Sequence, residues 1–273
     1  MRSERAAFFS VKSLEEGMVQ PTNEVIRQNL SAAELLVLLN PSVEAMEALK
    51  VGLKELLALG LVRLEKRLGR GWLGKEVPHP FLHISSRERP KNRVLDGLLG
   101  DLRSASRHSP ELGHVLKELQ KEHGQNYERF KQRIILPDLL AQGLLEPQTK
   151  KVLGLFRATH YGHTAAGLAY KKQLEHHVAQ ARRTRLLKDD PTHVAVLMVS
   201  LGPALLMPEL ELHFRQLNHG VRPEDGGYAL VFPAGGGRDE DRPFEADFKT
   251  LDQAFGDVCS GAGASGDAGS GGE

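Results

Sequence analysis

The stretch Leu30-Ser-Ala-Ala-Glu-Leu-Leu-Val-Leu-Leu39 decides the fold class of this chain. Ser31 and Glu34 stand three residues apart in front of an apolar run, which is the pattern of a capping box at the start of a helix. The breaker Asn40-Pro41-Ser42 ends that helix, and apolar residues then recur at helical spacing over residues 43–60. We therefore predict two helices that pack on each other within a mainly helical fold.

The composition of the 273-residue chain also favours helices. Apolar residues make up 40% of it and aromatic residues only 5%, so the core must be built mostly from Leu, Val and Ala. This length allows one large domain with a sizeable core. We expect an all-α domain over residues 30–220, a loosely ordered arm over residues 1–29, and an acidic, Gly-rich, disordered tail over residues 221–273.

Cysteine content and hydropathy bear on the compartment. The single cysteine, Cys259, excludes an internal disulfide and a cysteine metal cluster, which indicates a reducing environment. The longest apolar runs, such as residues 194–206, are shorter than the roughly 20 residues of a membrane-spanning helix. The first residues carry charge without the apolar segment of a signal peptide. We predict a cytoplasmic protein that is neither secreted nor integral to a membrane.

Local patterns predict the remaining elements. Residues 61–80 read either as two short strands joined by a basic turn or as an extended loop, and residues 144–161 read as a hairpin. An apolar helix opens at Asp190 and continues to Leu206. Pro137 is expected to kink a helix or to begin its second half. Helical spacing predicts four further helices, at residues 94–102, 110–124, 130–143 and 165–187.

Charge is distributed unevenly, although the net charge is only +1. Residues 129–188 hold twelve Lys or Arg against three Asp or Glu, whereas residues 209–273 hold thirteen Asp or Glu against five Lys or Arg. The basic segment indicates an anionic partner, for which the acidic tail would compete. Solvated helix faces would give the same pattern.

No residue pattern indicates catalysis or a bound metal. The chain lacks a nucleophile-elbow pattern, and Gly235-Gly-Gly237 precedes Arg238-Asp-Glu240 rather than the Lys and Ser/Thr of a phosphate-binding loop. None of the histidine pairs combines helical i, i+4 spacing with a nearby catalytic Glu. We expect no enzyme activity, no cofactor and no metal. The pairs considered are His160 with His163, His176 with His177, and His79 with His83.

A nucleic-acid-binding module is the alternative. The two helices of residues 30–60, followed by a basic turn and Trp72, resemble a winged helix in outline. The second helix, however, carries Glu44, Glu47 and Glu55. Negative side chains are unfavourable on a helix that lies against phosphates. We expect no nucleic-acid partner.

Three stretches, in order, resemble the Golgi phosphoprotein 3 family. The first is the opening stretch together with Glu55-Leu-Leu-Ala-Leu-Gly-Leu-Val-Arg-Leu-Glu65, which is similar to the family's opening helix and its E-L-A-L-x-G-x-L-x-L-E segment. The second, Val94-Leu-Asp-Gly-Leu-Leu99, looks like the family's L-L-D-x-A-L. The third and most specific begins at Arg129 and is similar to the family's R-x-x-L-x-x-K-G-x-L helix end and the apolar hairpin that follows. It continues through Leu139-Leu-Ala-Gln-Gly-Leu-Leu145 to Lys150-Lys-Val-Leu-Gly-Leu-Phe156.

The resemblance implies a helical domain that attaches peripherally to membranes through phosphatidylinositol 4-phosphate. The family's head-group pocket joins a Trp and an Arg before the second helix to two Arg residues three apart on a later helix. By alignment, the Trp position falls on Asn40 and the first Arg on Leu49, and the later pair falls on Arg129 and Gln132. Of these positions, Arg129 matches.

Basic residues beside the aligned positions complete the predicted lipid head-group site. Arg can engage a phosphate in bidentate fashion, whereas Lys supplies a point charge. Arg129 and Arg133 are four apart, so on an α-helix they would share a face, and Lys131 would point to another side. A solvated pair beside Glu128 is the alternative. The predicted site residues are Arg129, Lys131, Arg133 and Lys50.

The predicted hairpin supplies the second contact with the membrane. Its apolar residues would enter lipid while flanking cations lie among the head groups. Packing of the same residues into the core is the alternative. The expected partner is an anionic phospholipid surface, with self-association through the hairpin as a further role implied by the resemblance. The hairpin residues are Leu153, Leu155, Phe156 and Arg157.

Overall fold

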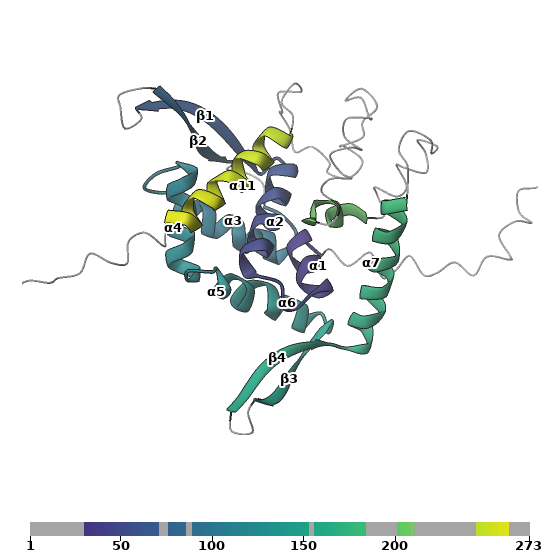
Figure 1. Ribbon diagram of the computed structural model, residues 1–273. Coiled ribbons are helices and arrows are strands. Elements are labelled where there is room, and N and C mark those ends of the chain that lie inside the picture. Colours follow the sequence, from purple (N-terminus) through teal and green to yellow (C-terminus); the bar gives the residue numbers. More distant parts are fainter. Residues whose placement is uncertain are drawn as a thin grey trace, which may run out of the picture.

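The computed structural model describes a mainly helical body that carries two β-hairpins (Figure 1). The described residues are 30–70, 76–85, 89–152, 156–183, 201–208, 210 and 244–261. The predicted N-terminal arm lies outside them. The prediction of a mainly helical protein is confirmed, and so is the interpretation of residues 61–80 as two strands.

The opening helix forms as the capping box predicts. In α1 (Ala32–Leu39), the Ser31 hydroxyl accepts from the backbone N–H of Glu34, and the Ser31 backbone N–H donates to the Glu34 carboxylate at 2.7 Å. Asn40 ends the helix with an extended backbone. The second helix, α2 (Ala45–Ala58), returns along the first and ends before Gly60, whose φ of 70° suits a residue without a Cβ.

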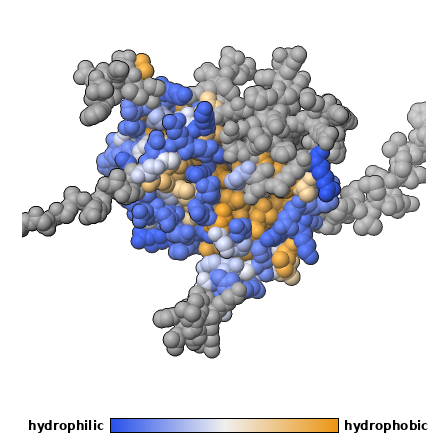
Figure 2. All heavy atoms as spheres, in the orientation of Figure 1, coloured by the Kyte–Doolittle hydropathy of each residue, from blue (hydrophilic) through white to orange (hydrophobic). Residues whose placement is uncertain are grey.

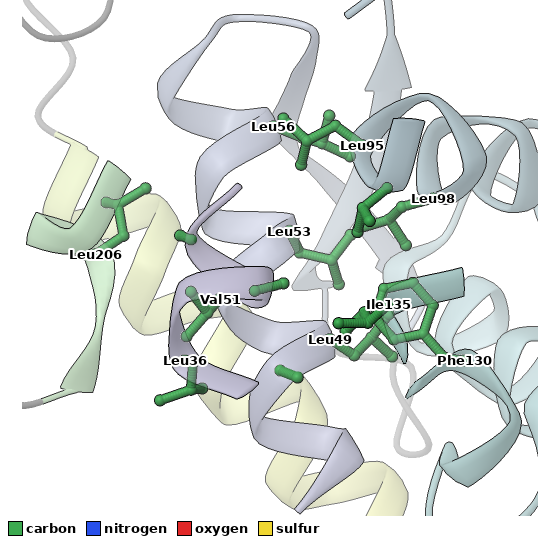
Figure 3. Packing of buried hydrophobic residues seen from close by; sticks show 14 of the residues in the cluster. Leu36, Leu49, Val51, Leu53, Leu56, Leu95, Leu98, Phe130, Ile135 and Leu206 are labelled. Atoms are coloured by element: carbon green, nitrogen blue, oxygen red, sulfur yellow. The ribbon is translucent and has the colours of Figure 1, made fainter. Parts of the chain in front are cut away.

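The helix α2 lies at the centre of the body, and its residues Val51–Ala58 are all buried. Figure 3 shows leucines of α2 pointing toward α3 on one side, while Leu36 and Val51 lie between α1 and α2. Figure 2 shows a mainly hydrophilic surface with an apolar area at the position of α1 and a smaller one at the end of α7 near the hairpin. The core residues drawn around α2 in Figure 3 include Leu49, Leu53, Leu56, Leu95, Leu98, Phe130, Ile135 and Leu206.

The first hairpin and the next two helices follow the predicted order. Strands β1 (Val62–Arg70) and β2 (Glu76–Ile84) pair antiparallel. Helix α3 (Arg93–Ala105) is capped by the Asn92 side chain, which accepts from the Leu95 N–H. Helix α4 (Leu112–His123) ends at Gly124, as the glycine predicts.

The helix predicted around Pro137 is built from three pieces: α5 (Glu128–Phe130), the π-helical turn η3 (Lys131–Ile135) and α6 (Leu136–Ala141). A proline inside a helix removes one hydrogen bond and crowds the carbonyl four residues earlier. Here the Leu136 N–H bonds to the Lys131 carbonyl, five residues earlier. The wider turn makes room for the ring, and Pro137 lies in the first turn of α6.

The second hairpin is formed by β3 (Leu145–Val152) and β4 (Phe156–His163), which confirms the hairpin predicted at residues 144–161. It projects from the helical body, and α7 (Ala165–Arg183) leads back from its base (Figure 1). Helix α7 matches the predicted basic helix. The apolar helix predicted from Asp190 falls mostly outside the described residues, and its end is the 3₁₀ turn η4 (Gly202–Leu206).

The prediction of a disordered tail is wrong for one segment. Residues 244–261 form helix α11 (Phe244–Gly261), which packs across α2 and α4 (Figure 1). Its buried residues recur at helical spacing, and they join the core of the body. The segment folds because this apolar stripe can be buried against the body. The average composition of residues 221–273 does not reveal the stripe, because the surrounding sequence is rich in acidic residues and Gly. The buried residues are Phe248, Leu251, Ala254, Phe255 and Val258.

Within the described parts of the chain, no helix combines the length and the apolar character that crossing a bilayer requires.

Candidate functional site

The two arginines of the predicted head-group site are exposed on the α5–η3 segment. Arg129 donates from Nη1 to the backbone carbonyl of Glu122, at the C-terminal end of α4, at 3.3 Å. That carbonyl belongs to the negative end of the α4 dipole, which favours a nearby cation. Arg133 lies within the π-helical turn, so the four-residue spacing does not stack the two side chains as an α-helix would.

Lys131 does not lie with the two arginines. Its side chain is buried, and Nζ donates to the backbone carbonyl of Val43, in the connection between α1 and α2, at 2.6 Å. Burial lowers the pKa of Lys131, and the charge of Glu128 opposes that effect. The predicted role of Lys131 as a head-group ligand is therefore corrected: it ties η3 to the first two helices.

Lys50 is also occupied. Its ammonium pairs with Glu47 at 2.7 Å and lies 5.6 Å from the centre of the Phe255 ring, in the geometry of a cation–π contact. The neighbouring Lys54 is bound in the same way, by Asp252 and by the Phe248 ring. Helix α11 thus lies against the cations of α2, and the structure does not bring Lys50 together with Arg129.

The remaining aligned family positions fall in different environments. Asn40 and Gln132 are exposed, whereas Leu49 is fully buried in the core. An Arg at the Leu49 position would have to be accommodated among apolar side chains at high cost. The aligned positions alone therefore do not form a pocket for a phosphate in the described structure.

Two side chains from the C-terminal side of the hairpin meet the last carbonyl groups of α1, and the sequence analysis did not predict these contacts. Lys171 of α7 donates to the carbonyl of Leu39 at 2.8 Å, and the His163 ring contacts the carbonyl of Leu38. The last carbonyls of a helix lack partners within the helix and attract cations. The sequence showed that residues 165–187 are basic, but this charge does not indicate that Lys171 bonds to the end of α1.

The predicted membrane residues of the β3–β4 hairpin are described only in part. Leu153 and Leu155 lie outside the described residues, and of Phe156 and Arg157 only the backbone is described. The register pairs Val152 with Phe156 as the last pair, and Lys151 with Arg157 before it. The hairpin base is anchored, because Leu145 is buried.

Two acidic side chains, Glu34 and Glu55, form a buried hydrogen-bonded network with α1. The sequence analysis predicted only its capping box, formed by Ser31 and Glu34. Glu34 and Glu55 are 0% and 4% exposed, and Glu55 accepts from the backbone N–H of Ala32 at 2.6 Å. Burial raises the pKa of Glu34 to about 7 and that of Glu55 to about 8. Hydrogen bonds to Ser31 and Ala32 oppose these shifts without cancelling them. This network joins the N-terminal end of α1 to α2.

One group of side chains in the described residues brings three possible metal-ligand atoms close together. Atoms of Asp101, Glu122 and His123 lie within 4.8 Å of one another, beside a cavity of about 360 Å³ between α3 and α4. His123 is buried, and its Nε2 is hydrogen-bonded to Asp101 at 3.0 Å. That bond joins the two helices directly. None of the histidine pairs considered in the sequence analysis belongs to this group.

Comparison with known proteins adds no assignment, because neither a family model nor a curated protein matches this chain.

Proposed function

We propose that this chain binds anionic phospholipid surfaces as a peripheral protein, through the far end of the β3–β4 hairpin and the exposed arginines of α5 and η3. The observation that carries the proposal is the hairpin itself. It projects from the body on the side where α5 and α6 lie (Figure 1). An anionic surface on that side of the body would face both.

The charges of the hairpin favour an anionic surface. Its register sets Lys151 opposite Arg157, and like charges directly opposite each other destabilise a strand pair in water. Lipid phosphates nearby relieve that repulsion. The apolar residues Leu153 and Leu155 lie between the two strands in the sequence, and in this proposal they enter the lipid between the head groups.

The resemblance to the Golgi phosphoprotein 3 family supports the same proposal and suggests phosphatidylinositol 4-phosphate as the preferred head group. Exposed Arg129 occupies a position aligned with a family arginine, and Arg133 lies four residues away. The proposal assigns both to phosphate contacts, because Arg presents several donors to phosphate oxygens. The activity is binding rather than catalysis.

The winged-helix alternative requires an exposed recognition helix. Helix α2 stands where that helix would be, but its residues Val51–Ala58 are all buried. A helix that enters a major groove must present one face to the DNA. The lipid proposal is favoured over nucleic-acid binding for this reason.

Liposome sedimentation tests the proposal. Each cation near an anionic surface contributes about 1 kcal/mol, so removing Arg129 and Arg133 costs about 2 kcal/mol, or about thirtyfold in affinity. The double reversal R129E/R133E is expected to lose at least this much at low salt. The matched control K66E/K117E makes the same change of net charge at exposed lysines of β1 and α4. The control should bind liposomes within about threefold of the parent. Equal losses of affinity in the two variants would mean that net charge, rather than Arg129 and Arg133, determines binding.

The hairpin is tested in the same assay. Burying a Leu or Phe side chain contributes roughly 1.5–3 kcal/mol, so L155A/F156A should weaken binding at high salt as well as at low salt. Size-exclusion chromatography with light scattering on the same variant tests self-association. A folded L155A/F156A protein that binds liposomes like the parent at every salt concentration would remove the hairpin from the proposal. Vesicles with and without phosphatidylinositol 4-phosphate then decide the head group, beside a DNA shift assay at the same salt.

A further inference from the structure

Three side chains with possible metal-ligand atoms meet where the end of α4 lies beside α3. Asp101, Glu122 and His123 each place one such atom within 4.8 Å of the others. His123 Nε2 lies 3.0 Å from Asp101 Oδ2, so the ring presents this nitrogen to the carboxylate of α3. One imidazole nitrogen and two carboxylates make a ligand set that first-row divalent cations such as zinc accept.

The fold fixes the direction of the histidine ring. The buried residues of α4 recur at helical spacing, and His123, which is 4% exposed, is the last of them. Its ring meets the buried Phe130 ring edge to face, at a centroid distance of 5.7 Å. Ligands held by packed helices keep a constant geometry, which favours metal binding. The imidazole is therefore a preformed ligand.

The negative charges of the group are not neutralised within the described part of the chain. The Asp101 carboxylate is bonded to the histidine, and the Glu122 carboxylate makes no hydrogen bond or ion pair with a described residue. The neighbouring cations have other partners. Lys121 pairs with Glu118 at 2.5 Å, and Arg129 donates to a backbone carbonyl. Two carboxylates this close repel each other, and a divalent cation between them would replace the repulsion with attraction.

The backbone and the shape of the surface also favour a cation here. Helix α4 ends at His123, and the free carbonyl groups at the C-terminal end of a helix carry partial negative charge. Glu122 lines the cavity of about 360 Å³ between α3 and α4. This cavity gives a dissolved ion a path to the group, which a metal site requires.

Small movements complete the coordination. Atoms bound about 2.0–2.2 Å from a tetrahedral ion lie about 3.3–3.6 Å apart. The distance of 3.0 Å between His123 and Asp101 is already close to this value. Glu122 is exposed, so a change of its side-chain rotamer can close a gap of about 1 Å without disturbing the core. The backbone of the two helices can stay where it is.

We propose that Asp101, Glu122 and His123 bind a first-row divalent cation, zinc in preference to magnesium, which links α3 to the end of α4. His123 binds through Nε2 with its proton on Nδ1, and a water molecule completes the four ligands. Imidazole gives the preference, because magnesium selects oxygen ligands. The sequence analysis expected no metal because it weighed pairs of histidines, whereas this group joins one histidine to carboxylates of two helices. The site is independent of the lipid proposal.

Isothermal titration calorimetry of the full chain, after dialysis against a chelator, tests the site. Zinc should bind with a dissociation constant below about 100 μM, and magnesium at least about a hundredfold more weakly. E122A changes an exposed residue, so it should fold, and it should weaken zinc binding at least about tenfold. Two matched controls should bind zinc like the parent. E128A removes an exposed carboxylate of α5, and H114A removes a histidine of α4 outside the group.

Cobalt(II) supplies a second readout, because its visible absorption reports the ligands and geometry of a zinc-type site. The parent should show these bands, E122A and H123Q should lose them, and H114A should keep them. Three results would overturn the proposal. The first is a parent that binds zinc more weakly than about 100 μM, and the second is magnesium binding as tight as zinc binding. The third is an E122A protein that binds zinc like the parent, which would place the ion elsewhere.

Discussion

Removing the ring of Phe255 tests whether helix α11 belongs to the folded body. Phe255 is 1% exposed, meets the Tyr127 ring edge to face at a centroid distance of 5.9 Å, and lies beneath the Lys50 ammonium. Truncating a buried Phe to Ala costs about 3–5 kcal/mol, and loss of the aromatic contact is included in that figure. We expect F255A to lower the free energy of unfolding by about 3–5 kcal/mol.

Urea denaturation followed by circular dichroism measures the change, with the slope of the transition fitted for each variant. Q253A is the matched control, because Gln253 is exposed on the same helix and such substitutions change stability by less than about 0.5 kcal/mol. A loss below about 1 kcal/mol in F255A, or equal losses in the two variants, would mean that α11 does not pack on α2 and α4 in solution. The reasoning that assigns residues 244–261 to the core would then fail.

Three further predictions concern the polar contacts of α1, α2 and η3. In the parent, the free energy of unfolding should fall by several kcal/mol as pH rises from 4.5 to 8, because Glu34 and Glu55, whose pKa values are raised to about 7 and about 8, hold protons that the unfolded chain releases. In urea titrations, E55Q should show a clearly smaller fall, since only the contribution of Glu34 remains. S31A removes the cap of α1 and a donor to Glu34, so thermal denaturation should report a loss of about 1–2 kcal/mol, and an unchanged midpoint would contradict the capping box. K131M keeps the apolar stem but leaves the Val43 carbonyl without its ammonium partner, and equilibrium unfolding should register a loss of about 1–3 kcal/mol.

Local sequence signals predicted the elements of the first half of the fold. Ser31 with Glu34, Gly60 and Gly124 each act within a few residues, and each marks a helix end that the structure contains. Pro137 predicted an interrupted helix but not how the chain would adjust, since a kink and a π-helical turn both accommodate the ring.

The candidate site could be predicted less well, because side-chain roles depend on contacts far apart in the sequence. Charge and a place beside the aligned family positions predict Lys131 and Lys50 as head-group ligands, yet Lys131 bonds to Val43 and Lys50 lies against α11. In the sequence, nothing distinguishes Glu55 from a solvent-exposed charged residue of a helix. Its burial results from the packing of other elements around it. The composition of residues 221–273 hid an apolar stripe that only residue spacing reveals.

The two-stranded sheets have a consequence for assembly. Each hairpin has backbone edges that are not paired in a sheet, apart from a bridge between Phe81 of β2 and Glu111, and such edges are potential templates for adding a strand from another molecule. Strand β2 contains Pro78 and Pro80, which occupy alternate positions and so remove two N–H donors from one edge, and β3 contains Pro147. Growth of these sheets into ribbons or fibrils is thereby opposed. An association of two copies through a shared β3–β4 sheet would therefore use the β4 edge, because Pro147 interrupts the β3 edge.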